Sequence, residues 1–225
     1  MKGLVNVVLL SQLAAYFAGF VLSLCLFVPM TLHLYDFRGF CLLFSTGTWR
    51  EEDGQFVVDW ASQLYCDYCI AVGGLLAILC LVQMYRLITF LYRGLDSSFL
   101  SAFCDVVISV GMAVLVLASA VMITTGFKSW CDDIMGRFPS CNDAAVNPID
   151  KADGIQTSGF YVQLGTAQFG AWGSWAACVG MSVFALLKVW QYHKSENIKL
   201  TMAQNRRRFR KGNVEDAADM DLIRG

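Results

Sequence analysis

Charged residues are scarce in this chain of 225 residues. Lys, Arg, Asp and Glu together make up 16% of it, whereas apolar residues make up 56%. A soluble domain usually carries about 25% charged residues. The charges are also clustered, because residues 3–35, 68–85, 106–127 and 154–187 contain none. This composition excludes both a water-soluble enzyme with one buried core and a disordered chain, and it indicates an integral membrane protein.

Each charge-free segment can hold one membrane-spanning helix, which needs about 20 apolar residues. We predict an all-α bundle of four transmembrane helices, at residues 5–32, 69–92, 100–125 and 163–189. The first is longer than the apolar core of a cleaved signal peptide, which has about 7–15 residues, so we expect it to be retained. The membrane domain then covers residues 1–191, with loops at 33–68 and 126–162, and a tail follows at 192–225.

The basic residues predict the orientation of the bundle. More than half of the Lys and Arg residues lie from Lys188 onward, whereas both long loops are net acidic. Because cytosolic segments are enriched in Lys and Arg, we expect both termini in the cytosol. The two long loops then face the exterior of the cell or the lumen of an organelle. The expected location is the plasma membrane or a membrane of the secretory pathway or its vesicles.

The outward loops contain cysteines that an oxidising compartment would allow to pair. Cys131 and Cys141 share the second loop and form a natural local pair. In the first loop, residues 41–46 and 55–60 are typical of two strands, and residues 52–54 supply the turn between them. A Cys41–Cys66 disulfide would attach this hairpin to the second helix, and such a bridge contributes about 3 kcal/mol.

A different pairing is open for Cys66. Together with Cys69 it forms a CxxC motif at the outer end of the second span, similar to the layout of bacterial quinone-linked disulfide oxidases. A helix N-terminus favours a thiolate, although Asp67 disfavours one. The alternative function is therefore a luminal thiol–disulfide oxidoreductase, in which Cys66 and Cys69 are the active pair and Cys131 and Cys141 relay electrons.

Three groups of residues resemble the transmembrane protein 179 family. They are residues 36–44 with 47–49 in the first loop, 126–132 with 140–141 in the second, and 160–161 with 167–175 in the fourth span. That family is a group of four-span membrane proteins without an assigned catalytic activity. The resemblance implies that cysteines at positions 41, 66, 131 and 141 belong to the family pattern. It also implies that Cys69 does not, which weakens the oxidoreductase alternative.

The spans offer little catalytic or transport chemistry. Ionisable residues such as Arg86, Asp105 and Lys188 are expected only at span ends, whereas transporters place such groups near the bilayer centre. We interpret the glutamines within the spans as links between helices. The only two histidines, His33 and His193, have no ligand set around them. We expect no metal, no cofactor and no nucleic-acid partner.

The fourth span has a face of small residues, which lets helix backbones approach closely in lipid. Two uses are open for this face: packing within the bundle, and docking against another membrane protein. Its members are Gly170, Gly173, Ser174, Ala177 and Gly180.

The tail contains a basic cluster that is followed by acidic residues. It can be a solvated, topology-setting segment, a binding site for anionic lipid or an arginine-based retention signal. The cluster consists of Arg206, Arg207, Arg208, Arg210 and Lys211. Taken together, these features predict a non-catalytic four-span accessory protein that binds another membrane protein.

Overall fold

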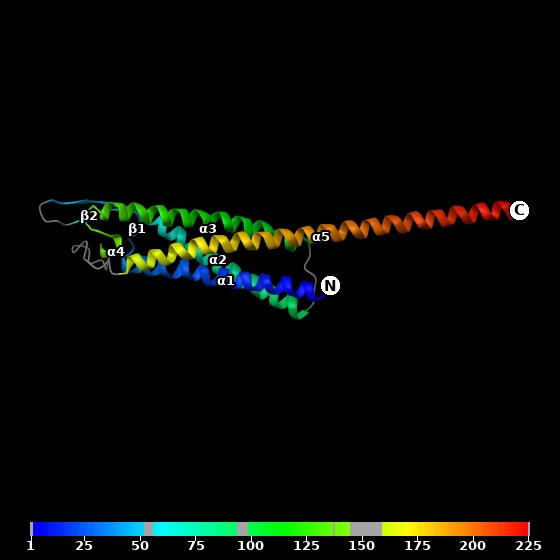
Figure 1. Cartoon of the computed structure of the whole chain (residues 1–225), viewed down its shortest axis with the longest axis horizontal. Helices are drawn as coiled ribbons and strands as arrows, with labels where there is room; N and C mark the ends of the chain where they lie inside the picture. Colours follow the sequence, from blue (N-terminus) through cyan, green and yellow to red (C-terminus); the bar gives the residue numbers. More distant parts are fainter. Residues whose placement is uncertain (1, 52–55, 94–98, 137, 145–158, 225) are drawn as a thin grey trace.

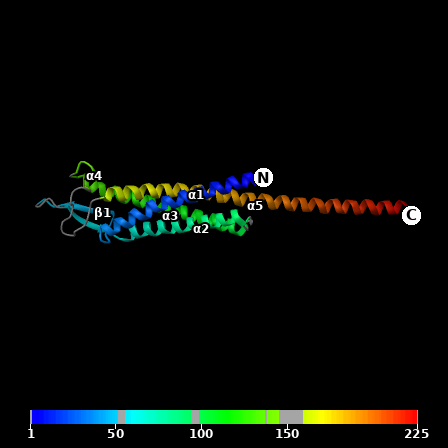
Figure 2. The same cartoon turned by 90° about the horizontal axis from the view of Figure 1, so that it is seen from below.

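The computed structural model describes residues 2–51, 56–93, 99–136, 138–144 and 159–224, and it shows an elongated bundle of helices (Figure 1). The long helices are α1 (Lys2–Asp36), α2 (Leu64–Arg93), α3 (Phe99–Ile134) and α5 (Phe160–Arg224). A hairpin of β1 (Cys41–Trp49) and β2 (Phe56–Ala61) lies at one end, with the one-turn helix α4 (Cys141–Ala144). The N-terminus lies at the other end, where α5 leaves the bundle (Figure 2).

Four helical segments are long and apolar enough to cross a membrane, which confirms the predicted fold class. They are Leu9–Asp36, Leu64–Tyr92, Leu100–Ile134 and Phe160–Gln191. Their ends at the hairpin differ from the predicted ones. α1 runs to Asp36, α2 begins at Leu64 and α3 continues to Ile134, where the prediction has 32, 69 and 125. Charged residues mark the edge of the apolar segment, but they do not stop a helix that packs against the hairpin.

The interior of the bundle contains many small and polar side chains. Ser23, Ser119, Ser174 and Ser182 are buried, whereas many large apolar residues lie exposed on the outside. This is the arrangement that a lipid solvent favours, because helices gain little from hiding apolar surface from lipid tails and associate through close packing. The helices contact one another in the order α2, α1, α5 and α3, and the contact between α2 and α3 is narrow.

The predicted hairpin is confirmed, with strands that differ slightly from the expected ones. β1 pairs with β2 in antiparallel register, with Thr48 opposite Val57 and Trp49 opposite Phe56. β1 extends to Trp49 rather than ending at 46, and the predicted turn at residues 52–54 lies outside the described residues. The pairing is irregular between Cys41 and Thr46, where Phe44 has a φ of 64°. The hairpin, α4 and the part of α3 from Gly126 to Ile134 are called the cap below.

Candidate functional site

A disulfide attaches the start of the hairpin to the start of α2. Cys41 and Cys66 are bonded, with their Cα atoms 5.8 Å apart. His33, buried at the end of α1, supports the same strand because its Nε2 accepts a hydrogen bond of 3.4 Å from the backbone N–H of Leu42. The hairpin is therefore held by both of the helices that flank it in the chain.

The second loop holds a second disulfide, between Cys131 of α3 and Cys141 of α4. The extra turns of α3 are what place Cys131 in the cap. They also provide Asp133, whose Oδ2 accepts a hydrogen bond of 3.2 Å from the backbone N–H of Gly47 in β1. The sequence analysis missed this contact, because it placed residues 126–162 in a loop and gave Asp133 no role.

A layer of aromatic side chains fills the space between the hairpin and α3. Trp130 of α3 is buried at its centre, with ring centroids 5.6 Å from Phe56, 6.4 Å from Trp60 and 6.5 Å from Phe160. Edge-to-face and stacked aromatic pairs at these distances add stabilisation beyond the area that they bury. The alternation along β2 fits this layer, because Phe56 is buried whereas Val57 and Asp59 are exposed.

This arrangement does not form the cysteine pair of the oxidoreductase alternative. Cys66 is bonded to Cys41, and Cys69 is free and fully buried one turn further along α2. A thiol on an active-site pair has to reach a substrate, so a buried Cys69 does not fit that role. No observation in the structure favours the alternative.

The small-residue face of α5 packs inside the bundle over part of its length. A Cβ atom added to Gly170 would lie 2.6 Å from the backbone of Cys25 and Leu26 in α1, and one on Gly173 would lie 2.8 Å from Leu22. Ser174 is fully buried. By contrast, a Cβ on Gly180 would meet nothing within 4 Å. These glycines thus split into a group that contacts α1 and a more open position closer to the tail.

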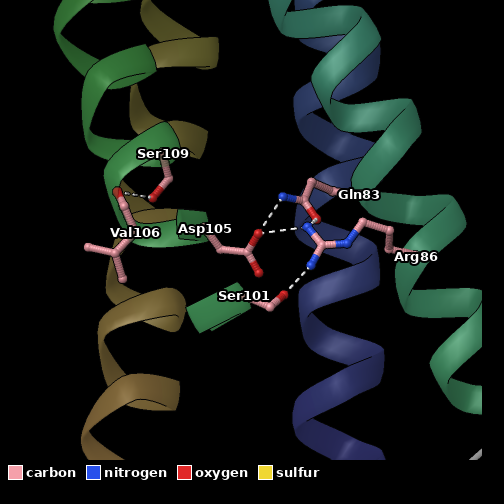
Figure 3. Close-up of polar contacts among 6 residues, drawn as sticks. All are labelled: Gln83, Arg86, Ser101, Asp105, Val106 and Ser109. Carbon is pink, nitrogen blue, oxygen red and sulfur yellow. Dashed lines mark hydrogen bonds and ion pairs between the residues drawn. The ribbon is translucent and has the colours of Figure 1, made fainter. Parts of the chain in front are cut away.

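The end of the bundle near the N-terminus contains a polar cluster that links α2 to α3 (Figure 3). Arg86 and Asp105 form an ion pair of 2.8 Å between Nη1 and Oδ1. Gln83 Nε2 donates to the same carboxylate oxygen at 2.8 Å, and its Oε1 accepts from Arg86 at 2.9 Å. Arg86 also donates to the hydroxyl of Ser101. The cluster adds a polar link between α2 and α3 next to the apolar contacts of Leu76 and Cys80 with Met112.

A partly open cavity adjoins the polar cluster and is lined by all four spans. Its polar lining consists of Gln12, Tyr16, Gln83, Arg86, Asp105 and Lys188. Its apolar lining comes mainly from α2 and α5. The sequence analysis treated the charged members as separate residues at span ends, and interpreted Gln83 as a link between helices, which it is. It missed the cluster, because residues far apart in the chain come together only through the packing of the helices.

The remaining predicted residues belong to the basic cluster of the tail. Arg206 is exposed on α5, and the side chains of Arg207, Arg208, Arg210 and Lys211 lie outside the described residues. The lipid-binding role of this tail cluster therefore stays a prediction. Within the described ranges, no three His, Cys, Asp or Glu residues group in a way that could hold a metal ion.

Four apolar helices and a disulfide-held hairpin define a four-span membrane protein with an ordered cap. The chain matches the family model described as the transmembrane protein 179/179B claudin domain over residues 8–210. This match covers most of the chain, so the chain belongs to that family, as the resemblance implied. No solved structure matches it.

Proposed function

We propose that this protein is a non-catalytic accessory subunit whose cap binds the outward part of another membrane protein. The observation that carries the proposal is the two-sided hairpin. One side, which includes Phe56 and Trp60, packs on the aromatic layer, and the other side is exposed. The exposed side presents Thr46, Thr48, Val57 and Asp59.

Pre-organisation supports a binding role for this exposed side. A surface that is already ordered loses little conformational entropy when a partner binds, so more of the contact energy appears as affinity. The Cys41–Cys66 disulfide, the His33 and Asp133 hydrogen bonds and the aromatic layer hold the hairpin in place. β-branched residues and one carboxylate make this side suited to a protein surface of mixed apolar and basic character.

The predicted orientation agrees with this role. With both termini in the cytosol, the cap faces the exterior or the lumen, where disulfides persist. The small-residue face of α5 is a weaker candidate for docking, because Gly170 and Gly173 already contact α1. We therefore assign the partner contact to the cap rather than to α5.

The test compares two arginine substitutions of exposed apolar residues, one in the cap and one just outside it. Val57→Arg places a cation on the exposed side of the hairpin, and Met135→Arg places one just beyond the end of α3. Cross-linking in native membranes, followed by quantitative mass spectrometry, is expected to lose membrane-protein partners with Val57→Arg and to keep them with Met135→Arg. Thermal stability and disulfide mapping establish that both variants fold.

Two results would overturn this proposal. One is an unchanged set of cross-linked membrane proteins in the folded Val57→Arg variant. The other is transport or catalysis by the purified wild-type protein alone in liposomes, since an accessory subunit has no such activity of its own.

A further inference from the structure

The cavity beside the polar cluster contains more positive than negative charge. Two cations, Arg86 and Lys188, line it together with one carboxylate, Asp105. Asp105 is already engaged by Arg86 and Gln83. Within the described part of the chain, no carboxylate lies at ion-pair distance from Lys188. The lining therefore has a net charge of +1, and the cation without a carboxylate of its own is Lys188 of α5, whose ammonium group lies 5.9 Å from the ring centroid of Phe90.

Lys188 faces the ion pair across the cavity, and it interacts electrostatically with both Asp105 and Arg86. Arg86 keeps 33% of its side-chain surface exposed, and its planar guanidinium has five N–H donors, of which the described contacts use three. An anion at the mouth of the cavity would accept hydrogen bonds from both cations.

Uncharged donors lie beside the cations. Tyr16 and Gln12 of α1 line the same cavity, and neither makes a side-chain hydrogen bond with another described residue. A phenol and an amide can both donate to an oxyanion. The cavity thus offers donors from three helices, and the remaining lining, which includes Phe90 and Phe184, is apolar.

The position of these residues along the helices selects a lipid as the source of the anion. Arg86 and Lys188 lie about 9 Å and about 5 Å, measured along the helix axis, from the span ends at Tyr92 and Gln191. The polar headgroup region is about 5–7 Å thick on each side of a bilayer, and lysine and arginine side chains extend towards it. A phosphate at this depth belongs to a membrane lipid whose chains pass along the apolar lining.

We propose that the mouth of this cavity binds the phosphate of an anionic membrane lipid between Arg86 and Lys188. Lys188 supplies the counter-charge, and Arg86 shares its remaining donors while it stays paired with Asp105. A zwitterionic lipid fits less well, because the one carboxylate among the described lining residues is already bound. This inference goes beyond the proposed partner binding and does not depend on it.

Native mass spectrometry of the purified full-length protein tests the proposal, with phosphatidic acid as the probe and phosphatidylcholine as the comparison. We expect one phosphatidic acid to bind preferentially to the wild type. Lys188→Gln is expected to weaken that binding at least about tenfold, because it removes a charge-assisted contact. Lys188→Arg keeps the charge and is expected to retain it.

The matched control is Lys194→Gln. This residue lies on the same helix beyond the span, and its ammonium group lies 5.5 Å from the ring centroid of Trp190. If the proposal holds, removing this charge leaves the binding of phosphatidic acid unchanged. Repeating the titration at high salt separates the cavity from the basic tail, because exposed charges are screened more strongly than partly buried ones.

Three outcomes would overturn the proposal. The first is that the wild type binds phosphatidic acid and phosphatidylcholine equally well. This measurement does not depend on the folding of any variant. The second is an equal loss of binding in Lys188→Gln and Lys194→Gln, which would indicate general surface attraction. The third is that inorganic phosphate displaces bound phosphatidic acid as effectively as added phosphatidic acid does. The ligand would then be a soluble anion.

Discussion

The two ends of the bundle are held together by different kinds of interaction. At the cap, two disulfides, an aromatic layer and hydrogen bonds to buried side chains fix the chain. At the opposite end, one ion pair with its hydrogen-bonding neighbours links α2 to α3, next to an apolar cluster that the two helices share. Disulfides and aromatic packing hold the first, and the second combines apolar packing with a small charged network beside a cavity.

This difference indicates a division of roles. A rigid surface suits recognition of a protein, because it is ordered before the partner arrives. A charged network next to a cavity keeps donors available for a ligand and can rearrange at moderate cost. The comparison therefore predicts that a substitution at one end changes the local structure of that end and leaves the other end as in the wild type.

The largest effect is expected where α5 contacts α1. In Gly170→Leu the new side chain meets the α1 backbone at Cys25 and Leu26, which cannot move aside as a flexible side chain can. We expect a loss of about 3 kcal/mol or more in the free energy of unfolding, or no folded protein. The measurement is the yield of monodisperse protein in detergent and its melting temperature.

Gly180→Leu is the matched control for this change. It adds the same side chain to the same helix at a position with nothing within 4 Å of an added Cβ. We expect it to change the free energy of unfolding by less than about 0.5 kcal/mol. Equal behaviour of the two variants would contradict the assignment of Gly170 to internal packing.

The next effect concerns the cap disulfide. Replacing both Cys41 and Cys66 by serine is expected to lower the free energy of unfolding by about 3 kcal/mol, because the unfolded chain gains the freedom of an open loop. Thermal unfolding in detergent measures the loss. Cys104→Ser, which removes an exposed free thiol, is the control and is expected to change little. A double variant that unfolds at the same temperature as the wild type would contradict this prediction.

Asp105→Asn tests the opposite end. The substitution leaves Arg86 without its carboxylate, and we expect a loss of about 1–2 kcal/mol, since the pair is only partly buried. The double variant with Arg86→Gln is expected to recover part of that loss. Hydrogen exchange should increase in the adjoining ends of α2 and α3 and stay unchanged in the cap. Faster exchange in the hairpin would contradict the separation of the two ends.

Much of the fold could be predicted from local sequence patterns. Stretches without charge locate the four spans, because a charge inside hydrocarbon is costly. The alternation in residues 55–60 predicts a strand with one buried side. The helix ends beyond the bilayer could not be predicted in the same way. The cap turns of α3 are stabilised by their contacts with β1, which lie far away in the sequence.

The polar cluster was harder to predict than the hairpin. Gln83 and Arg86 are three residues apart on one helix, which hints at a shared face. Asp105 and Lys188 come from other helices, and nothing in their immediate sequence indicates a common cavity. The cysteines were more informative, because Cys131 and Cys141 share one loop and form a natural local pair. Even so, the choice between Cys41 and Cys69 as the partner of Cys66 needed the three-dimensional arrangement.

The smallest predicted effect lies inside the hairpin, at the irregular part of its pairing. The hydroxyl of Ser45 donates to the backbone oxygen of Cys41 at 2.7 Å and accepts from the backbone N–H of Ala61 at 3.0 Å. It therefore bridges the two strands where the regular pairing is interrupted. Ser45→Ala removes this bridge and leaves the N–H of Ala61 without that acceptor, so we expect a loss of about 1 kcal/mol.

The exposed neighbour of Ser45 provides the control for this change. Thr46→Ala removes a hydroxyl from the outer side of the same strand and is expected to have little effect on the melting temperature. Ser45→Ala should lower it by a few degrees and should increase hydrogen exchange at Ala61, while the exchange of α2 and α3 near Asp105 stays as in the wild type. An effect that reached Asp105 would mean that the two ends are coupled through the bundle. In that case, binding of a protein at the cap would alter binding at the distant cavity.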